Sequence, residues 1–170
     1  GEGGLPSKEW YAIKIERSAR LRDVFRNSSC RLQDFLKENP EEARKYPYLV
    51  DHERQLRFLS HVYATGACLY EGQALLDKYS SKGISERFKP SVDADILRFE
   101  ELVKNEISNT QAFIKFLNEG GNIGMVLLPM ETTYAYSDYL PILLEKKIEI
   151  MQRHLPETTE VLNRWFNSEY

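Results

Sequence analysis

The stretch from residue 91 to residue 120, SVDADILRFEELVKNEISNTQAFIKFLNEG, decides the fold. Its apolar residues recur at steps of three and four, as they do on one face of an α-helix, and come close to a heptad repeat. The members of this apolar stripe are Ile96, Phe99, Val103, Ile107, Phe113, Ile114 and Leu117, with Thr110 in the same seam. Ser91 can cap the start, and Gly120 with Gly121 signals the end. The pattern predicts a long helix that buries one face against other helices.

Three further stretches, 10–36, 49–76 and 133–155, show the same helical period. Their apolar positions include Trp10, Ile13, Val24, Phe25, Phe35, Leu49, Leu56, Leu59, Tyr63, Tyr70, Leu76, Tyr136, Leu140, Leu144, Ile148, Met151 and Leu155. No stretch alternates polar and apolar residues for long enough to predict a strand. We therefore predict an all-α fold, an up-down-up-down four-helix bundle with a short C-terminal fifth helix.

Prolines predict where these helices begin and bend. Pro40 follows an asparagine that can act as an N-cap, which predicts a short helical turn before Pro47 starts the second long helix. Pro141 falls inside the fourth helical pattern and predicts a kink near Ser137, four residues earlier. Residues 156–166 begin with another proline and predict the short fifth helix, docked on the bundle by its apolar side chains.

Length and composition predict one globular domain. Residues 1–6, GEGGLP, are typical of a linker or tag remnant, and residues 7–170 form the single helical domain. The longest uncharged apolar run, 123–130, is far shorter than the roughly 20 residues that cross a membrane, so no membrane span is expected. The net charge is −3 with both signs interspersed, so the sequence gives no sign of a nucleic-acid partner. The sequence does not indicate the cellular compartment of the protein.

Two cysteines, Cys30 and Cys68, fall on different predicted helices. A bridge requires their Cα atoms to lie within about 7 Å of each other, and a helical core of this size needs no such bond. We therefore expect two buried free thiols, although the sequence does not determine their redox state.

Tyrosines suggest a ligand pocket between helices. The chain has ten, and Tyr63 and Tyr70 on the second long helix could face the tyrosines that precede Pro141. Phenol rings combine an apolar face with a hydroxyl group, which suits a small polar or aromatic ligand, although such rings also serve as packing. The candidate ligand-binding residues are Tyr63, Tyr70, Glu106, Tyr134, Tyr136 and Tyr139.

Small residues interrupt the second long helix near these tyrosines. Gly66, Ala67, Cys68 and Gly72 either let a neighbouring helix approach closely or leave a hollow. Glycine inside a helix costs about 1 kcal/mol relative to alanine, so a packing or functional reason is expected.

A metal site is the alternative. The strongest candidate ligands are His52 and Glu53, with His61 nine residues later and Glu106 on the next long helix. The architecture is similar to that of ferritin-like and sensor-type bundles, but only in fold. Di-metal bundles of the ferritin-like class use Glu-x-x-His motifs, and this chain has none. The preferred interpretation of the sequence is therefore a protein without a bound metal, and the sequence specifies no cofactor.

These observations lead to two hypotheses about function. The first is a non-enzymatic binding or interaction module, because no Gly-x-Ser-x-Gly motif or phosphate loop suggests catalytic residues. Its ligand would lie between the helices, or a protein partner or second copy would dock on the apolar loop 123–130, which could equally act as a lid or plug. The second hypothesis is a ferritin-like metal-binding or oxidoreductase bundle.

Overall fold

A computed structural model describes residues 6–80, 91–120 and 140–167 of the 170-residue chain. Within these ranges the chain is helical and contains no strand, which confirms the all-α fold. The helices are α1 (Lys8–Glu38), α2 (Pro40–Lys45), α3 (Tyr48–Ser80), α4 (Ser91–Gly120) and α5 (Leu140–Asn167). The predicted loop 123–130 and the residues Tyr134, Tyr136 and Tyr139 lie outside the described residues.

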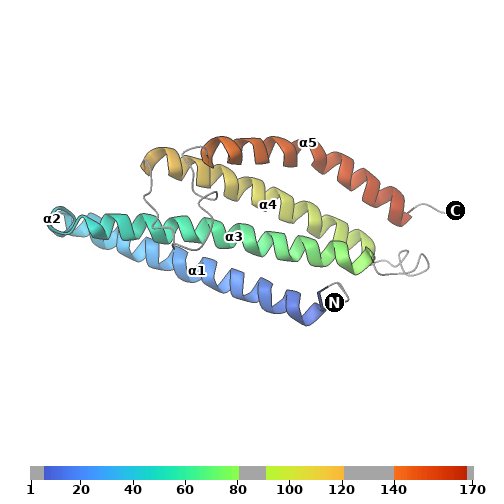
Figure 1. Cartoon of the computed structure of the whole chain (residues 1–170), viewed down its shortest axis with the longest axis horizontal. Helices are drawn as coiled ribbons and strands as arrows, with labels where there is room; N and C mark the ends of the chain where they lie inside the picture. The colour runs from blue at the N-terminus through green and yellow to red at the C-terminus, as the bar shows by residue number, and fades with distance from the viewer. Residues whose placement is uncertain (1–5, 81–90, 121–139, 168–170) are drawn as a thin grey trace, which may run out of the picture.

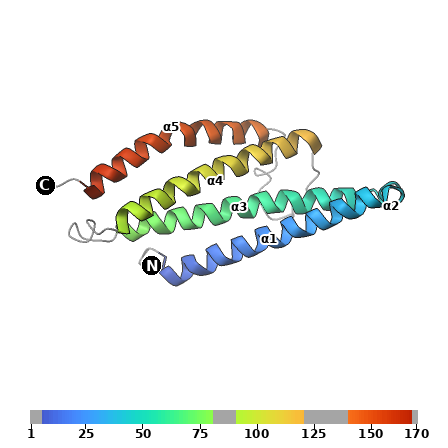
Figure 2. The ribbon, with the colours of Figure 1, turned by 180° about the vertical axis from the view of Figure 1, so that it is seen from behind.

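The four long helices lie side by side in chain order, and each runs antiparallel to the one before it (Figure 1). Figure 2 shows the same order from behind, with α2 at the turn between α1 and α3. The order of the long helices in the figures agrees with the predicted up-and-down order, but the contacts do not confirm a closed four-helix bundle. Among the described helices, however, extensive packing joins only α1 to α3, α3 to α4 and α4 to α5. The long helices form an open row, in which α1 packs extensively only against α3, and α5 only against α4.

The start of the chain follows the local signals closely. Ser7 caps α1 by accepting a hydrogen bond from the backbone N–H of Trp10 at 3.1 Å. Asn39 ends the helix, and its backbone N–H donates to the carbonyl of Phe35 at 2.9 Å. Pro40 then occupies the first turn of α2, where a missing N–H costs nothing. The predicted short helix before Pro47 is confirmed.

The C-terminal helix differs from the prediction. Helix α5 continues through Pro156 to Asn167, so residues 156–166 extend it and do not form a separate fifth helix. Proline lacks the N–H that would bond the carbonyl of Gln152, which weakens a helix without always ending it. In Figure 1 the axis of α5 bends part-way along its length. Pro141 lies in the first turn of α5, where no N–H is needed, and the expected kink at Ser137 falls outside the described residues.

The interfaces on the two sides of α3 differ in character. Between α3, α4 and α5 an apolar cluster forms around Phe58, Phe113 and Phe116, which are 2–5 % exposed. Partly buried side chains pack around this cluster: Val62, Leu117, Leu140 and Leu144. The interface between α1 and α3 has fewer buried apolar side chains and instead contains the buried hydroxyl groups of Ser18 and Ser29.

The sequence left two explanations open for the small residues of α3, a close helix approach or a hollow. Gly66 and Gly72 each correspond to one of them. A Cβ atom on Gly66 would lie 3.5 Å from Oγ of Ser18, so Gly66 permits a close approach of α1. A Cβ atom on Gly72 would meet only Cε2 of Phe99, at 3.8 Å, beside a cleft between α3, α4 and α5. One glycine therefore brings two helices together, and the other leaves a hollow.

Leucine substitutions should separate these two roles. Gly66→Leu forces side-chain atoms into the α1–α3 interface, and overpacking of this kind typically lowers the free energy of unfolding by about 1–3 kcal/mol. Gly72→Leu directs its extra atoms into the cleft and gains helix propensity, so stability should be unchanged or higher by up to about 1 kcal/mol. Urea denaturation followed by circular dichroism measures both. Equal destabilisation by the two substitutions would contradict this assignment.

Candidate functional site

A cleft of about 280 Å³ opens between α3, α4 and α5. Its walls are mainly apolar, formed by Leu69, Leu76, Phe99, Leu102, Val103 and Met151. Thr65, Glu106 and Lys147 bring polar groups from the three helices into the same space. A mainly apolar hollow with a few convergent polar groups is the usual form of a small-molecule site.

The helical period explains how α3 contributes to this cleft. Residues Thr65, Leu69, Gly72 and Leu76 recur at steps of three and four, so they share one side of the helix. Because Gly72 has no side chain, α3 leaves space in the middle of this surface. On α5, Lys147 and Met151 are four residues apart and close the opposite wall.

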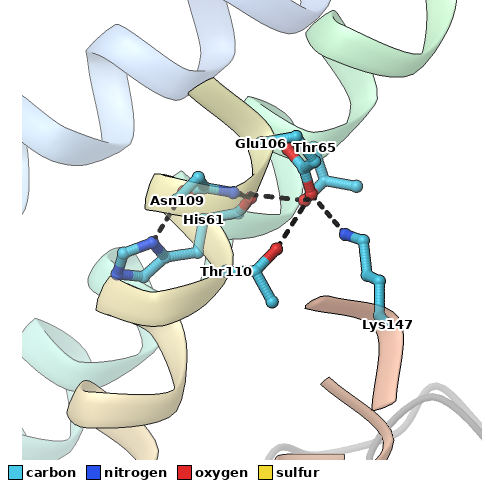
Figure 3. A network of polar contacts seen from close by, with 6 residues as sticks. All are labelled: His61, Thr65, Glu106, Asn109, Thr110 and Lys147. Atoms are coloured by element: carbon cyan, nitrogen blue, oxygen red, sulfur yellow. Dashed lines mark hydrogen bonds and ion pairs between the residues drawn. The ribbon is translucent and has the colours of Figure 1, made fainter. Parts of the chain in front are cut away.

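The carboxylate of Glu106 joins the three helices. Its side chain is only 9 % exposed, and Oε1 accepts hydrogen bonds from Oγ1 of Thr65 at 2.6 Å and Oγ1 of Thr110 at 3.3 Å. Lys147 of α5 forms an ion pair with the same oxygen. Figure 3 shows these donors converging on one atom. Charge-assisted hydrogen bonds of this kind are stronger than neutral ones, so Glu106 fixes the positions of α3 and α5 relative to α4.

The network extends from Thr65 to His61 through Asn109 (Figure 3). The amide nitrogen of Asn109 donates to Oγ1 of Thr65 and to the carbonyl of His61, both at 3.2 Å. Its oxygen therefore accepts from Nδ1 of His61 at 2.9 Å, which requires a proton on that nitrogen. Burial of the ring, which stacks on Phe113, lowers the pKa of His61. The neutral Nδ1–H form of the imidazole fits this site.

The second oxygen of Glu106 is left without a partner. Within the described structure Oε2 is buried and accepts no hydrogen bond, although Oε1 accepts three. Leaving a buried polar group unpaired costs about 1–3 kcal/mol, and more when the group is charged. Because Glu106 lines the cleft, a hydrogen-bond donor that reaches this oxygen would be stabilised.

The cysteines are both free thiols. The expectation that both are buried is wrong for Cys30, which is exposed on α1, whereas Cys68 is partly buried and lines the cleft. Burial, with smaller contributions from Glu106 and Glu71, raises the pKa of Cys68 to about 11. The Cys68 thiol is therefore protonated at neutral pH and is a poor nucleophile there.

Of the ligand-binding residues predicted from the sequence, Glu106 lines the cleft. Tyr63 and Tyr70 instead face α1, where Tyr63 stacks on Phe25 at 5.5 Å and Tyr70 contacts Trp10 at 5.7 Å between ring centroids. At about 100° per residue, these tyrosines lie on the side of α3 roughly opposite to Gly72. The other candidates, Tyr134, Tyr136 and Tyr139, are outside the described residues.

Sequence reasoning did not assign the apolar wall to a site, and it missed Thr65 on α3 and Lys147 on α5, the partners of Glu106. The place of Thr65 in the site could have been inferred from the sequence, since Thr65 shares the helix face of Gly72. The helical period was also a signal for Lys147, since this residue falls between Leu144 and Met151 at steps of three and four, whereas Lys146 does not share that face.

The candidate metal ligands do not converge. His52 is exposed beside the ring of Tyr48, whereas Oε1 of Glu53 accepts from Oγ of Ser29 at 2.8 Å and pairs with Arg57 at 2.6 Å. His61 faces α4. Across residues 6–80, 91–120 and 140–167, no group of three or more His, Cys, Asp or Glu side chains is arranged to hold a metal ion. The suggested site of His52, Glu53 and Glu106 is not assembled, because Arg57 already neutralises Glu53 at the α1 side of α3.

Comparisons with protein-family models, with curated protein sequences and with solved structures gave no match to the chain. None of the described helices combines the length and the apolar character that crossing a membrane requires. The geometry of the cleft is therefore the basis on which we infer a function.

Removal of Lys147 should expose the importance of its ion pair with Glu106. Lys147→Met leaves a buried carboxylate without its cation. We expect a loss of about 2 kcal/mol, below the roughly 3–5 kcal/mol of a fully buried pair, because the lysine side chain keeps 32 % exposure. The double variant Glu106→Gln, Lys147→Met removes both charges and should recover most of this stability.

Lys146→Met is the matched control. Lys146 is exposed and pairs with Glu149 on the surface of the same helix, so its removal should change the free energy of unfolding by less than about 0.5 kcal/mol. Urea denaturation of the four proteins gives the comparison. A double variant no more stable than Lys147→Met would show that the charge pair is not the cause.

Protonation of His61 should destabilise the fold. Because its pKa is lower in the folded protein than the value of about 6.5 in an unfolded chain, the unfolded chain takes up the proton first as pH falls. The free energy of unfolding should therefore fall as the pH drops below about 6.5. The fall should level off once the pH is below the lower pKa of folded His61. Urea midpoints measured from pH 7.5 to 5 should fall more for the wild type than for His61→Gln. An NMR titration that places the pKa of folded His61 at or above 6.5 would overturn this expectation.

Proposed function

We propose that this protein is a non-enzymatic ligand-binding helical module that takes a small molecule into the cleft between α3, α4 and α5. The observation that carries the proposal is that Glu106, whose buried Oε2 atom is unpaired in the described structure, lines a mainly apolar cleft. A ligand that occupies this space gains from apolar contact and can satisfy an acceptor that the described protein groups leave open.

The size of the cleft supports a small ligand. Its volume of about 280 Å³ exceeds the roughly 150 Å³ of an apolar cavity that binds benzene, and it is near the lower end of the 300–1,000 Å³ range of small-molecule sites. Leu69 and Leu76 remain 63 % and 38 % exposed beside the cleft, so a ligand would cover apolar surface that water now contacts.

The chemistry of the described cleft favours binding over catalysis. Lys147 and Thr65 both donate to Glu106, so the polar groups are engaged with one another. Cys68 is a protonated thiol at neutral pH because burial raises its pKa to about 11. A nucleophile needs an adjacent base or a lowered pKa, and the described wall supplies neither to Cys68.

This proposal keeps part of the expectation from the sequence. A small ligand between helices and the role of Glu106 remain, whereas aliphatic side chains, Phe99 and Met151 replace Tyr63 and Tyr70 as the proposed walls. The roles of Tyr134, Tyr136 and Tyr139 stay predictions, as does a protein partner or homodimer.

A ligand should stabilise the protein and shield Cys68. In a thermal-shift screen of small uncharged compounds, a ligand at 100 times its dissociation constant should add about 2.7 kcal/mol to the free energy of unfolding. The same ligand should slow the reaction of Cys68 with iodoacetamide at pH 8, where about 0.1 % of this thiol is ionised. Mass spectrometry of peptides measures the reaction at each cysteine.

Cys30 and Gly72→Leu provide the controls. Cys30 is exposed on α1, away from the cleft residues, so its reaction rate should not change when ligand is added. Gly72→Leu fills the cleft and should abolish both the thermal shift and the protection of Cys68. The proposal fails if no compound stabilises the wild type more than it stabilises Gly72→Leu.

A further inference from the structure

We infer that the cleft selects an uncharged molecule with an apolar body and a single hydroxyl or N–H donor, which bonds Oε2 of Glu106. This inference rests on the proposed function and specifies the class of ligand. It follows from the hydrogen bonds, the charges and the walls of the site, taken in turn.

The hydrogen bonds leave room for a donor. Thr65, Thr110 and Lys147 all use Oε1 of Glu106, and the buried Oε2 accepts nothing. A ligand with only an ether or ketone oxygen would leave Oε2 unpaired and would place two acceptors near each other. A hydroxyl or N–H group satisfies this oxygen, and hydrogen bonds to charged acceptors are stronger than those between neutral groups.

The charges favour a neutral ligand. Glu106 and Lys147 form an ion pair whose carboxylate is almost fully buried, so together they contribute no net charge to the cleft. The neighbouring carboxylate of Glu71 is also neutralised, because Arg98 donates to both of its oxygens at 2.7 and 3.0 Å. A cationic or anionic ligand would enter a partly dry site without a free counter-ion and would lose its hydration.

The walls require an apolar body. Leu102 is only 5 % exposed, and Phe99, Val103 and Met151 complete a surface of aliphatic, aromatic and thioether groups. By comparison with benzene in a cavity of about 150 Å³, a cleft of about 280 Å³ accommodates roughly ten non-hydrogen atoms. The ligand class is therefore a small alcohol, phenol or non-basic N–H compound that has one donor group and a hydrocarbon body.

Four probes of nearly equal size test this class: 1-octanol, 2-octanone, octylammonium and octanoate. Each is titrated into the full chain labelled with ¹³C at the methionine methyl groups. Met151 lines the cleft, so a shift of its signal, assigned with Met151→Leu, locates the binding. We expect 1-octanol to bind about ten-fold more tightly than 2-octanone, because only the alcohol donates to Oε2. Both charged probes should bind more weakly than 1-octanol.

The double variant Glu106→Gln, Lys147→Met should remove this preference. Its amide oxygen can still accept from Thr65, whereas the amide nitrogen places a donor where Oε2 was. 2-Octanone should then bind at least as tightly as 1-octanol. Glu119→Gln, which neutralises an exposed carboxylate near the end of the same helix, should keep the wild-type ranking.

The outcomes separate the two proposals. If none of the four probes shifts the Met151 signal, the proposed ligand-binding function fails. If the probes bind but 1-octanol shows no preference over 2-octanone, or a charged probe binds most tightly, the inference about ligand class is wrong while the cleft remains a binding site. Should the double variant not fold, the wild-type ranking of the four probes decides by itself.

Discussion

The buried carboxylate of Glu106 is the interaction on which the arrangement of α3, α4 and α5 depends. One oxygen gathers donors from all three helices, and Thr110, the most buried of these donors, is 1 % exposed. On one side of this carboxylate lies the aromatic cluster of Phe58, Phe113 and Phe116, and on the other side lies the cleft. Burial of a charge is costly, and here the cost is offset because hydrogen bonds and a cation surround one oxygen of the carboxylate. The other oxygen remains the open position of the site.

The interface between α1 and α3 is built on a different principle. Small and polar groups replace the large apolar ones: Ser18 lies against Gly66, and Ser29 donates to Glu53, which also pairs with Arg57. Aromatic contacts such as Phe25 with Tyr63 fill the remaining space. Because each interface joins only successive long helices, the described row stays open, and the cleft forms where α3 and α5 both flank α4.

Sequence reasoning reached Glu106 but not the wall that surrounds it. The apolar period and the caps specify the helices well, since both act between residues that are close in the chain. Pro156 was misread as a boundary because a proline weakens a helix locally, whereas the surrounding turns of α5 continue past it. Tyr63 and Tyr70 were assigned to a pocket because phenol rings suit a small polar or aromatic ligand. The face of α3 that carries them meets α1, while Thr65 and Gly72 on the other side of α3 meet the cleft.

The amino-acid sequence alone was enough to predict the all-α class, the long helices with most of their ends, and which residues share a face of each helix. These properties follow from the 3.6-residue period and from hydrogen bonds within one or two turns. Only the tertiary structure decided which face meets which neighbour. The rotation of each helix is set by contacts between residues far apart in the chain, such as Thr65 with Glu106 and Glu106 with Lys147. For that reason the open oxygen of Glu106, and with it the proposed site, became visible only in the folded chain.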